Sequence, residues 1–285
     1  MAEEGLATFG AWVVERELGR GSMGVVYAVF DRGSGERRAL KTLRSDGPQP
    51  SAEALALFER EVRICTELRH PHLVRLDGSG HTGAVHWLVM ELCEGGSLMD
   101  LVRTGGPLPA ARAVPLVVDV LDGLTYAHEV RGAVHRDIKP QNILLGPGTE
   151  STAASRPVAK IADFGLAKAY ATAGLSGLTA TGSVSGTPAF MPRAQLVNYK
   201  YAQPHVDVWA TAATLYFLLT GHTPRDFPVG RDPWLTVTTT AAVPVGERGV
   251  PLPDRLERVL DRALRDGPEP EFRTADAFKK ALQAT

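Results

Sequence analysis

Cysteine is scarce in this sequence, with Cys65 and Cys93 the two examples among 285 residues. Two thiols cannot form the disulfide framework of a small secreted domain, so a reducing compartment is expected. The first residues are acidic and lack the basic region and apolar run of a signal peptide. No uncharged apolar stretch reaches the ~20 residues that cross a bilayer. We therefore expect a soluble cytoplasmic protein without a membrane segment.

An excess of either charge is also absent, because 31 Lys and Arg residues are matched by 32 Asp and Glu residues, for a net charge of -1. A chain this close to neutral is not attracted in bulk to nucleic acids or to membranes. Its 44% hydrophobic and 22% charged residues are typical of a globular protein. The length is near the upper limit for one core, so we expect a single domain over 1–285, as one body or two lobes.

The stretch 134–165 carries the strongest chemical signal. It runs His-Arg-Asp-Ile-Lys-Pro-Gln-Asn over 135–142, continues as an apolar strand, and later reads Asp-Phe-Gly over 163–165. This alternation of loop, strand and turn is expected to bring Asp137, Asn142 and Asp163 near one spot. Their oxygens are the hard donors that Mg²⁺ prefers, and Mg²⁺ commonly shares its shell with phosphates. Either motif alone is weak, but both in this order resemble the catalytic loop and metal-binding turn of protein kinases.

The resemblance covers nearly the whole chain, roughly 9–282, and is to eukaryotic-like serine/threonine protein kinases of the bacterial type. It implies an α+β bilobal fold, with an antiparallel β small lobe that carries one helix and a mainly α-helical large lobe. The small lobe would span about 9–92, and the hinge and large lobe about 93–282. The implied activity is transfer of the γ-phosphoryl group of ATP to Ser or Thr hydroxyls of protein substrates.

The glycine pattern over 19–24 tests this resemblance. Gly19, Gly21 and Gly24 form a G-x-G-x-x-G, which lets the backbone approach phosphates but also occurs in dinucleotide-binding folds. A helix should follow in those folds. Here the β-branched and aromatic residues of 25–30 predict a strand instead. The hairpin of two strands over 12–30 therefore favours the kinase arrangement and rejects the dinucleotide interpretation.

Lys41 and Glu61 are predicted to form an ion pair. The strand 38–43 places Ala39 and Lys41 on one face because strand side chains alternate. The helix 51–69 carries an apolar stripe that includes Glu61, and an inward carboxylate needs a cationic partner. The alternatives are a solvated lysine on the strand and a glutamate that reaches solvent at the edge of the stripe.

The resemblance implies a role for each residue of the site. Asp137 would accept or orient the proton of the attacking hydroxyl, and Lys139 would neutralise the transferring phosphoryl group. Lys41, held by Glu61, would bind the α- and β-phosphates. Mg²⁺, with Mn²⁺ as an alternative, would bind Asn142 and Asp163. The residues expected around ATP are Leu18, Gly19, Gly21, Gly24, Val26, Ala39, Lys41, Met90 as gatekeeper, the backbone of Glu91 and Cys93 in the hinge, and Leu144.

The segment 166–187 is rich in small and hydroxylated residues and has little to bury, which predicts a mobile loop. Our hypothesis is that Thr179 or Thr181 is autophosphorylated and docks near Arg136, because arginine pairs with phosphate bidentately. The alternative is an ordinary flexible loop. Thr187 resembles the substrate-loop threonine of the family, which contacts the catalytic aspartate and lysine.

The chain departs from the family pattern at Pro192-Arg193-Ala194, where the family usually has Ala-Pro-Glu. The usual glutamate pairs with an arginine near the C-terminus, and Arg273 matches that arginine. Ala194 cannot make this pair, and a buried arginine without a partner is destabilising. Either another group meets Arg273, or Arg273 is solvated.

Further helices are expected over 114–128, 206–220, 253–265 and 274–282. The helix 206–220 is apolar almost all round, which predicts a buried central helix that ends at Gly221. Asp207 near its start resembles the family aspartate that holds the backbone of the catalytic loop. A favourable interaction with the helix dipole is the alternative role for this carboxylate.

Two other functions compete with the protein kinase. A pseudokinase scaffold would normally have lost Lys41, Asp137, Asn142 or Asp163, and all four are present. A small-molecule phosphotransferase is disfavoured by the position of Lys139, two residues after the aspartate, and by the threonine-rich segment. The expected partners are ATP and proteins that bear Ser or Thr, with no nucleic acid. Transient self-association for autophosphorylation is compatible with the resemblance.

Overall fold

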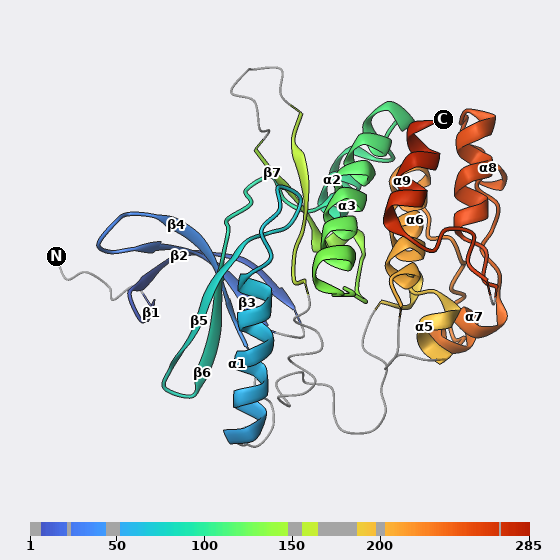
Figure 1. Cartoon of the computed structure of the whole chain (residues 1–285). Coiled ribbons are helices and arrows are strands. Elements are labelled where there is room, and N and C mark those ends of the chain that lie inside the picture. The colour runs from blue at the N-terminus through green and yellow to red at the C-terminus, as the bar shows by residue number, and fades with distance from the viewer. Residues whose placement is uncertain are drawn as a thin grey trace. The chain divides into compact units, whose positions relative to one another are not determined.

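The computed structural model describes most of the chain (Figure 1). The described residues are 7–21, 24–43, 52–147, 156–164, 187–197, 203–267 and 269–285, with the side chains of 52–55, 57, 61, 64 and 197 outside the description. The contacts divide these residues into two compact units. Unit 1 holds the described residues up to Glu94 together with Asp163 and Phe164, and unit 2 holds the rest.

Unit 1 is an antiparallel sheet with one helix, as predicted for the small lobe. The strands follow the order β1-β2-β3-β4-β6-β5. They are β1 (Thr8–Phe9), β2 (Trp12–Gly21), β3 (Gly24–Asp31), β4 (Arg37–Thr42), β5 (Leu76–Thr82) and β6 (Val85–Met90), and the helix is α1 (Ala52–Thr66). The predicted hairpin is confirmed, because β2 pairs directly with β3 and no helix follows the glycines.

Alternation along β4 explains how the sheet of unit 1 is covered. Leu40 packs on one face in a cluster with Val29 and Val89. Ala39 lies in a different cluster that includes Phe58 and other apolar residues of α1. The alternation predicted from sequence is therefore confirmed, and the helix covers the face that carries Ala39.

Unit 2 is mainly helical. Its helices are α2 (Leu98–Gly105), α3 (Ala110–Arg131), α5 (Arg193–Val197), α6 (His205–Thr220), α7 (Pro233–Thr239), α8 (Asp254–Ala263) and α9 (Ala275–Gln283). Short 3-10 turns are η1 (Pro140–Asn142), η2 (Pro188–Phe190) and η4 (Val245–Arg248), and a two-stranded sheet pairs β7 (Ile143–Gly146) with β8 (Val158–Ile161). The α+β fold with an antiparallel and a helical part is confirmed.

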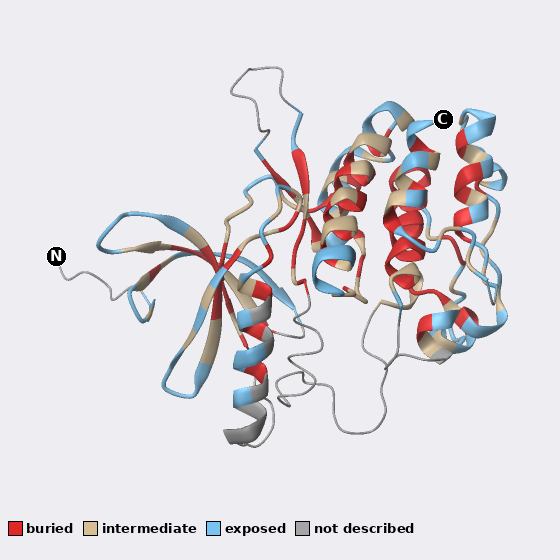
Figure 2. Ribbon diagram, viewed as in Figure 1, coloured by how far each residue is buried: buried red, intermediate tan, exposed pale blue. Residues whose placement is uncertain are grey.

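Helix α6 forms the core of unit 2 (Figure 2). Every residue from Val206 to Thr220 is buried, and α6 contacts α3, α8 and α9. It ends at Gly221, which has a φ of 74° and suits a left-handed C-terminal cap. The predicted buried helix and its end are both confirmed. No helix within the described part of the chain is long and apolar enough to cross a membrane.

Helix α3 is longer than the predicted 114–128. It begins at Ala110 although Pro115 lies inside it and cannot donate a helical hydrogen bond. Its inward face includes Leu116, Val117 and Leu121, all at most 3% exposed. Burial of that face outweighs the loss of one hydrogen bond, a balance that local propensity does not reveal.

Candidate active site

Unit 1 holds an ion pair between two predicted site residues. Lys41 on β4 is only 7% exposed, and its Nζ lies 2.7 Å from Oδ2 of Asp163. A solvated strand lysine is therefore excluded. Asp163 has a φ of 57°, a left-handed conformation that costs about 1–3 kcal/mol in a residue with a side chain and is concentrated at functional sites. The side chain of Glu61, the predicted partner of Lys41, lies outside the described residues.

The glycine hairpin is not explained by the needs of the fold alone. Gly24 has a φ of 142°, where a side chain would be strained. A Cβ atom added to Gly19 or Gly21 would meet nothing within 4 Å. These two glycines leave open space above the strands, as close approach of a ligand to the backbone requires. Ser22 and Met23 at the tip lie outside the described residues, and Leu18 is 36% exposed.

The predicted adenine-binding side chains of unit 1 come together on the sheet. Ala39 pairs with Met90 across β4 and β6, and Val26 packs against the cluster that contains both. The predicted gatekeeper Met90 and the strand residues Val26 and Ala39 thus share one apolar surface. Leu144, the remaining predicted adenine contact, lies on β7 of unit 2.

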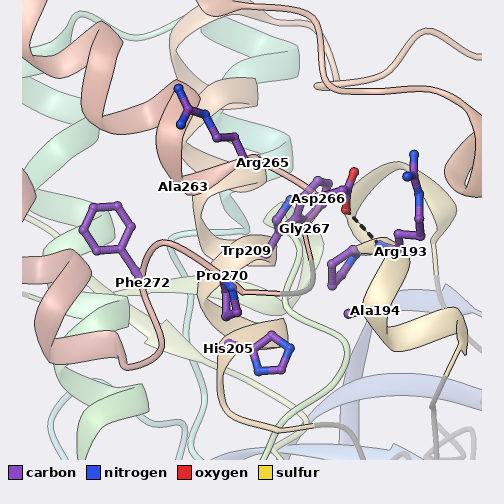
Figure 3. Close-up of a pocket in the computed structure, with 11 residues that line it drawn as sticks. Arg193, Ala194, His205, Trp209, Ala263, Arg265, Asp266, Gly267, Pro270 and Phe272 are labelled. Atoms are coloured by element: carbon purple, nitrogen blue, oxygen red, sulfur yellow. Dashed lines mark hydrogen bonds between the residues drawn. The ribbon is translucent and has the colours of Figure 1, made fainter.

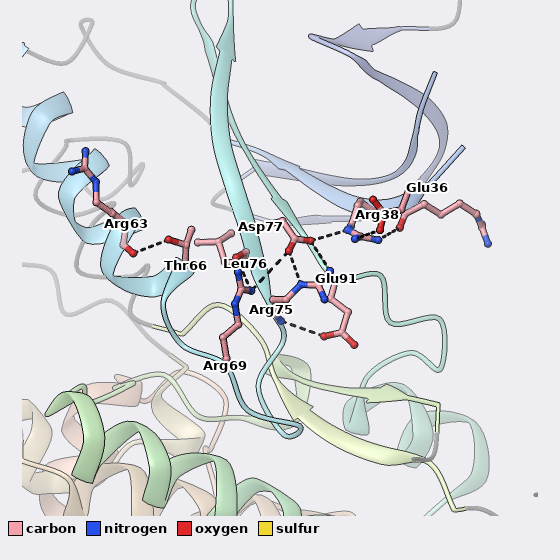
Figure 4. Close-up of polar contacts among 10 residues, drawn as sticks. Glu36, Arg38, Arg63, Thr66, Arg69, Arg75, Leu76, Asp77 and Glu91 are labelled. Carbon is pink, nitrogen blue, oxygen red and sulfur yellow. Dashed lines mark hydrogen bonds and ion pairs between the residues drawn. The ribbon is translucent and has the colours of Figure 1, made fainter. Parts of the chain in front are cut away.

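The predicted hinge is anchored by Arg75, the residue before β5, which charged residues of β4 and β5 hold in turn (Figure 4). The N–H of Glu91 donates to the carbonyl of Arg75 at 2.8 Å, and the Glu91 carboxylate accepts from the N–H of Arg75 at 3.3 Å. The Asp77 carboxylate receives Nε of Arg75 at 2.5 Å and Nε of Arg38 at 2.7 Å. Burial alone would raise the pKa of Asp77, but hydrogen bonds and charge from Arg75 and Arg38 lower it. Because the N–H of Glu91 already donates to Arg75, the backbone carbonyl of Glu91 is the group to consider as a hydrogen-bond partner of adenine.

Unit 2 gathers three predicted residues into one polar cluster. Lys139 Nζ donates to the two carboxylate oxygens of Asp137 at 3.0 and 2.8 Å. Asn142 Nδ2 donates to Oδ2 of Asp137 at 3.0 Å and to its backbone carbonyl at 2.9 Å. The Asn142 carbonyl also accepts from the N–H of Ala162, the residue before Asp163. The loop therefore brings Asp137, Lys139 and Asn142 together, whereas Asp163, the third group expected near this spot, belongs to unit 1.

Asp207 holds the catalytic loop from α6. Its Oδ1 accepts the N–H of Arg136 at 2.7 Å, and its Oδ2 accepts the N–H of His135 at 2.8 Å and contacts Nε2 of His128 at 2.8 Å. Its side chain is fully buried. Burial alone would raise the pKa of Asp207, but the hydrogen bond and charge of His128 and the hydrogen bond from the N–H of His135 hold it below its usual value. A favourable interaction with the helix dipole alone therefore does not explain the contacts of this carboxylate.

The ring of His135 fixes the loop from inside. Its Nδ1 accepts the N–H of Asp137 at 3.1 Å, so Nε2 carries the proton and donates to the carbonyl of Ala162 at 2.9 Å. Arg136 has a φ of 68°, a second left-handed residue that a side chain disfavours. Hydrogen bonds on both sides of Arg136 therefore hold its backbone in this conformation, just before Asp137.

Gln195 is a supporting residue that sequence reasoning missed. It is 2% exposed, and its Nε2 donates to the carbonyl of Arg136 at 2.7 Å. It lines one small cavity together with Arg136, Asp137 and Thr187. The predicted substrate-loop threonine therefore lies beside the predicted catalytic aspartate. A polar residue one position after the altered Pro-Arg-Ala triplet gave no signal of this role.

Arg273 is solvated, which is one of the two outcomes expected from Ala194. Its side chain is 71% exposed and lies 3.8 Å from Glu269, which is 83% exposed. The buried cation of this region is Arg225 instead. Its guanidinium pairs with Asp266 and donates to the carbonyls of Met191 and Thr240, each at 3.0 Å. Sequence reasoning missed this pair because an arginine in a proline-rich loop resembles a solvated residue.

Several predicted features lie outside the described residues. These are Thr179 and Thr181, Gly165 of the Asp-Phe-Gly turn and the side chain of Glu61. Cys93 of the predicted hinge is described and is half-buried.

The predicted metal ligands fit Mg²⁺ by their chemistry. The amide nitrogen of Asn142 is directed at Asp137, which leaves the amide oxygen as the donor for a cation. Asp163 supplies a carboxylate in unit 1, and both are oxygen ligands of the type that Mg²⁺ selects. Among the described residues, no group of three or more His, Cys, Asp or Glu could hold a metal ion. Phosphate oxygens and water would have to complete the shell, as is usual for Mg²⁺.

The antiparallel and helical units and the Asp137 cluster define a protein kinase. A family model described as a protein kinase domain matches residues 12–233. The chain therefore belongs to the protein kinase family, which confirms the resemblance found in its motifs.

Three relatives place the chain among bacterial members. It is 33% identical over 291 residues to serine/threonine-protein kinase pkn2 of Myxococcus xanthus, covering 100% of this chain and 34% of that protein. It is 36% identical over 213 residues to PknL of Mycobacterium tuberculosis, covering 75% of this chain and 50% of that protein. A mutant kinase domain of Mycobacterium tuberculosis PknI has a similar structure, with a TM-score of 0.73, 25% identity and coverage of 100% and 99%. The chain thus spans between a third and a half of the length of these two curated relatives.

Proposed function

We propose that this chain is a serine/threonine protein kinase that transfers the γ-phosphoryl group of ATP to protein hydroxyls. The single observation that supports this most is the Asp137 carboxylate held by Lys139 and Asn142, in a loop that Asp207 fixes from the core. A pseudokinase scaffold has no need of such an ordered catalytic loop. We therefore favour turnover over a scaffold role.

The proposed roles follow from where charge develops during transfer. The transition state spreads negative charge over the phosphoryl oxygens, so cations must be placed before reaction. Asp137 orients the attacking hydroxyl and takes its proton, and Lys139, bonded to that carboxylate, stabilises the phosphoryl group. Lys41 holds the α- and β-phosphates. Because Lys139 is already within hydrogen-bond distance of Asp137, little reorganisation is needed.

Mg²⁺ is the proposed metal, with Mn²⁺ as the alternative, and Asn142 and Asp163 are its proposed protein ligands. Bound metal would neutralise phosphate charge. The proposed nucleotide contacts are the glycine hairpin at Leu18, Gly19, Gly21 and Gly24, the apolar Val26, Ala39, Met90 and Leu144, and the backbone of Glu91 and Cys93.

Replacing Gly21 by alanine is expected to lower kcat/KM for ATP by between about tenfold and a hundredfold, because the added methyl group displaces the phosphates from the backbone. The free energy of unfolding should change by less than about 0.5 kcal/mol, since the fold leaves space for this Cβ. Gly78→Ala on β5 is the matched control, because its Cβ also meets nothing within 4 Å. An unchanged kcat/KM in Gly21→Ala would remove the hairpin from the ATP site.

We further propose that phosphorylated Thr179 or Thr181 pairs with Arg136. Among the described residues, Nε of Arg136 is one of two buried side-chain atoms without a hydrogen-bond partner. A phosphate brings roughly -1.5 to -2 charges and can satisfy such a donor. Thr187 is proposed to position the substrate beside Asp137.

Dephosphorylation tests this pairing. Phosphatase treatment is expected to lower the activity of the native protein by about tenfold or more. This is the effect expected from the loss of one or two charge-assisted hydrogen bonds. The same treatment should leave an Arg136→Ala variant unchanged, because the phosphate has no partner there. Mass spectrometry of active protein that finds both Thr179 and Thr181 unmodified would rule the hypothesis out.

The acceptor class separates the protein kinase from a small-molecule phosphotransferase. The experiment is incubation with labelled ATP and Mg²⁺, with a generic basic protein in one sample and a mixture of small alcohols or antibiotics in another. We expect label on Ser or Thr of protein and none on the small acceptors. Labelled small molecules without labelled protein would favour the phosphotransferase.

The proposed location is the cytoplasm, because two cysteines are too few for the disulfide framework of a secreted domain. Transient self-association is proposed as the route to autophosphorylation. Dilution of the enzyme should then slow autophosphorylation per molecule, whereas a rate independent of concentration would indicate a reaction within one chain.

A further inference from the structure

Arg136 holds an unfavourable backbone conformation directly before the proposed catalytic base. Its φ of 68° lies in the left-handed region, which is costly for a residue with a side chain and persists only where the surroundings impose it. The next residue is Asp137, whose carboxylate has to face the attacking hydroxyl. The groups that impose the conformation of Arg136 therefore also decide where Asp137 lies.

The peptide unit between Arg136 and Asp137 is bonded at both of its polar atoms. Its carbonyl accepts Nε2 of Gln195 at 2.7 Å, and its N–H donates to Nδ1 of His135 at 3.1 Å. The N–H of Arg136 donates to Oδ1 of Asp207 at 2.7 Å. A change in the φ of Arg136 would turn the peptide units on its two sides relative to each other. Such a turn would break the bond to Gln195 or the bond to Asp207.

Gln195 is a buried amide in α5. It is 2% exposed and lines one small cavity together with Thr187 and Asp137. An apolar side chain in its place would take a hydrogen-bond donor from a carbonyl inside the protein, which is unfavourable. Because α5 follows the predicted substrate-loop threonine in the chain, this hydrogen bond joins the segment 187–195 to the catalytic loop.

The start of α5 is anchored by a buried ion pair. Ala194 is exposed and lines a cavity of about 420 Å³, so its methyl group anchors little (Figure 3). The N–H of Arg193 donates instead to Oδ1 of Asp266 at 3.1 Å, as the dashed line in Figure 3 shows. Arg225 pairs with Asp266 and donates to the carbonyl of Met191 at 3.0 Å. One buried pair thus fixes the backbone where α5 begins, and with it the helix that carries the amide.

We propose that Gln195 is a positioning residue for phosphoryl transfer, which orients Asp137 by holding Arg136 in its left-handed conformation. This inference rests on the proposed kinase function. It makes the catalytic loop depend on the place of the substrate loop, because a shift of α5 would withdraw the amide from the carbonyl of Arg136. In a chain with alanine at 194, that place is set by the pair of Arg225 and Asp266.

Gln195→Met removes the amide and keeps the length of the side chain. We expect kcat to fall by about tenfold or more, because a small displacement of the Asp137 carboxylate is sufficient for such a loss. The KM for ATP should change by less than about twofold, since none of the proposed nucleotide contacts involves Gln195. Gln283→Met, at an exposed position on α9, is the matched control and should change neither constant. A native kcat in Gln195→Met would overturn the proposal.

Two backgrounds separate this role from a contribution to stability alone. Arg136→Ala and Arg136→Gly both remove the guanidinium, but glycine alone adopts the left-handed conformation without a steric penalty. Gln195→Met should lower kcat by about tenfold or more in the alanine background and by about threefold or less in the glycine background. Equal losses in the two backgrounds would show that Gln195 does not act through the conformation of residue 136, and would overturn the proposal.

Hydrogen exchange of the full chain gives a readout that does not depend on phosphoryl transfer. In Gln195→Met, the amides of 135–137 should exchange about tenfold faster or more, while the later turns of α6 keep their native rates and show that the core is folded. Unchanged exchange at 135–137 would overturn the inference whatever the activity. Faster exchange in the variant, together with no phosphoryl transfer by the native chain, would refute the proposed function and still confirm that Gln195 holds Arg136.

Discussion

Replacing Arg225 by alanine is expected to lower the free energy of unfolding by about 3–5 kcal/mol, the cost of breaking a buried ion pair from one side. Arg225 is fully buried, and its removal takes the cation from Asp266 and the donors from the carbonyls of Met191 and Thr240. The stacking on Trp209 is lost as well. Denaturant unfolding followed by tryptophan fluorescence measures the change.

Two variants control this experiment. Arg273→Ala removes an exposed arginine and should change the free energy of unfolding by less than about 0.5 kcal/mol. Asp266→Asn in the Arg225→Ala background should recover part of the loss, because the unpaired buried charge is removed. A larger loss from Arg273→Ala than from Arg225→Ala would contradict the assignment of the buried cation.

Replacing Asp207 by asparagine is expected to damage both stability and activity. The carboxylate accepts the N–H groups of His135 and Arg136 and contacts His128, and an amide cannot accept on both of its ends. At least one buried donor then faces another donor, at about 1–3 kcal/mol for each unsatisfied group. Because the catalytic loop loses its anchor, kcat should fall by about tenfold or more, and a variant with native kcat would contradict this role.

The pH dependence of the Asp207→Asn variant has a definite sign. The folded-state pKa of Asp207 is lower than its unfolded value, so ionisation contributes stability at neutral pH. That contribution begins to disappear as the pH falls below the unfolded value of about 4 and is lost below the folded pKa. The difference in unfolding free energy between the native protein and the variant should therefore shrink on acidification. A difference that grows below pH 4 would oppose this account.

Much of the fold followed from patterns that depend on local sequence. The alternation around Lys41 predicted which strand residues face α1, and the apolar run of α6 predicted its burial. The glycine pattern followed by β-branched residues predicted a hairpin. These features are set by periodicity and turn chemistry, which neighbouring residues determine. The Asp137 cluster was also predictable, because its members lie within six residues.

Other features depend on tertiary contacts that no local pattern encodes. Arg225 finds Asp266 at a separation of 41 residues, and Asp207 finds His128 at 79. Gln195 supports Arg136 through a side chain whose type is common on surfaces. The start of α2, by contrast, is encoded locally, because Ser97 and Asp100 form a capping box.

The most direct test of the central claim is label incorporation from ATP with Mg²⁺ by the native chain and by Asp137→Asn, with a basic protein as acceptor. ATP binding is measured for both in parallel. We predict that native protein labels Ser or Thr and that the variant binds ATP normally but is about 10²–10⁴-fold slower. No label with either protein, while both bind ATP, would contradict the kinase assignment, favour the scaffold, and make Ala194 the first residue to restore to glutamate.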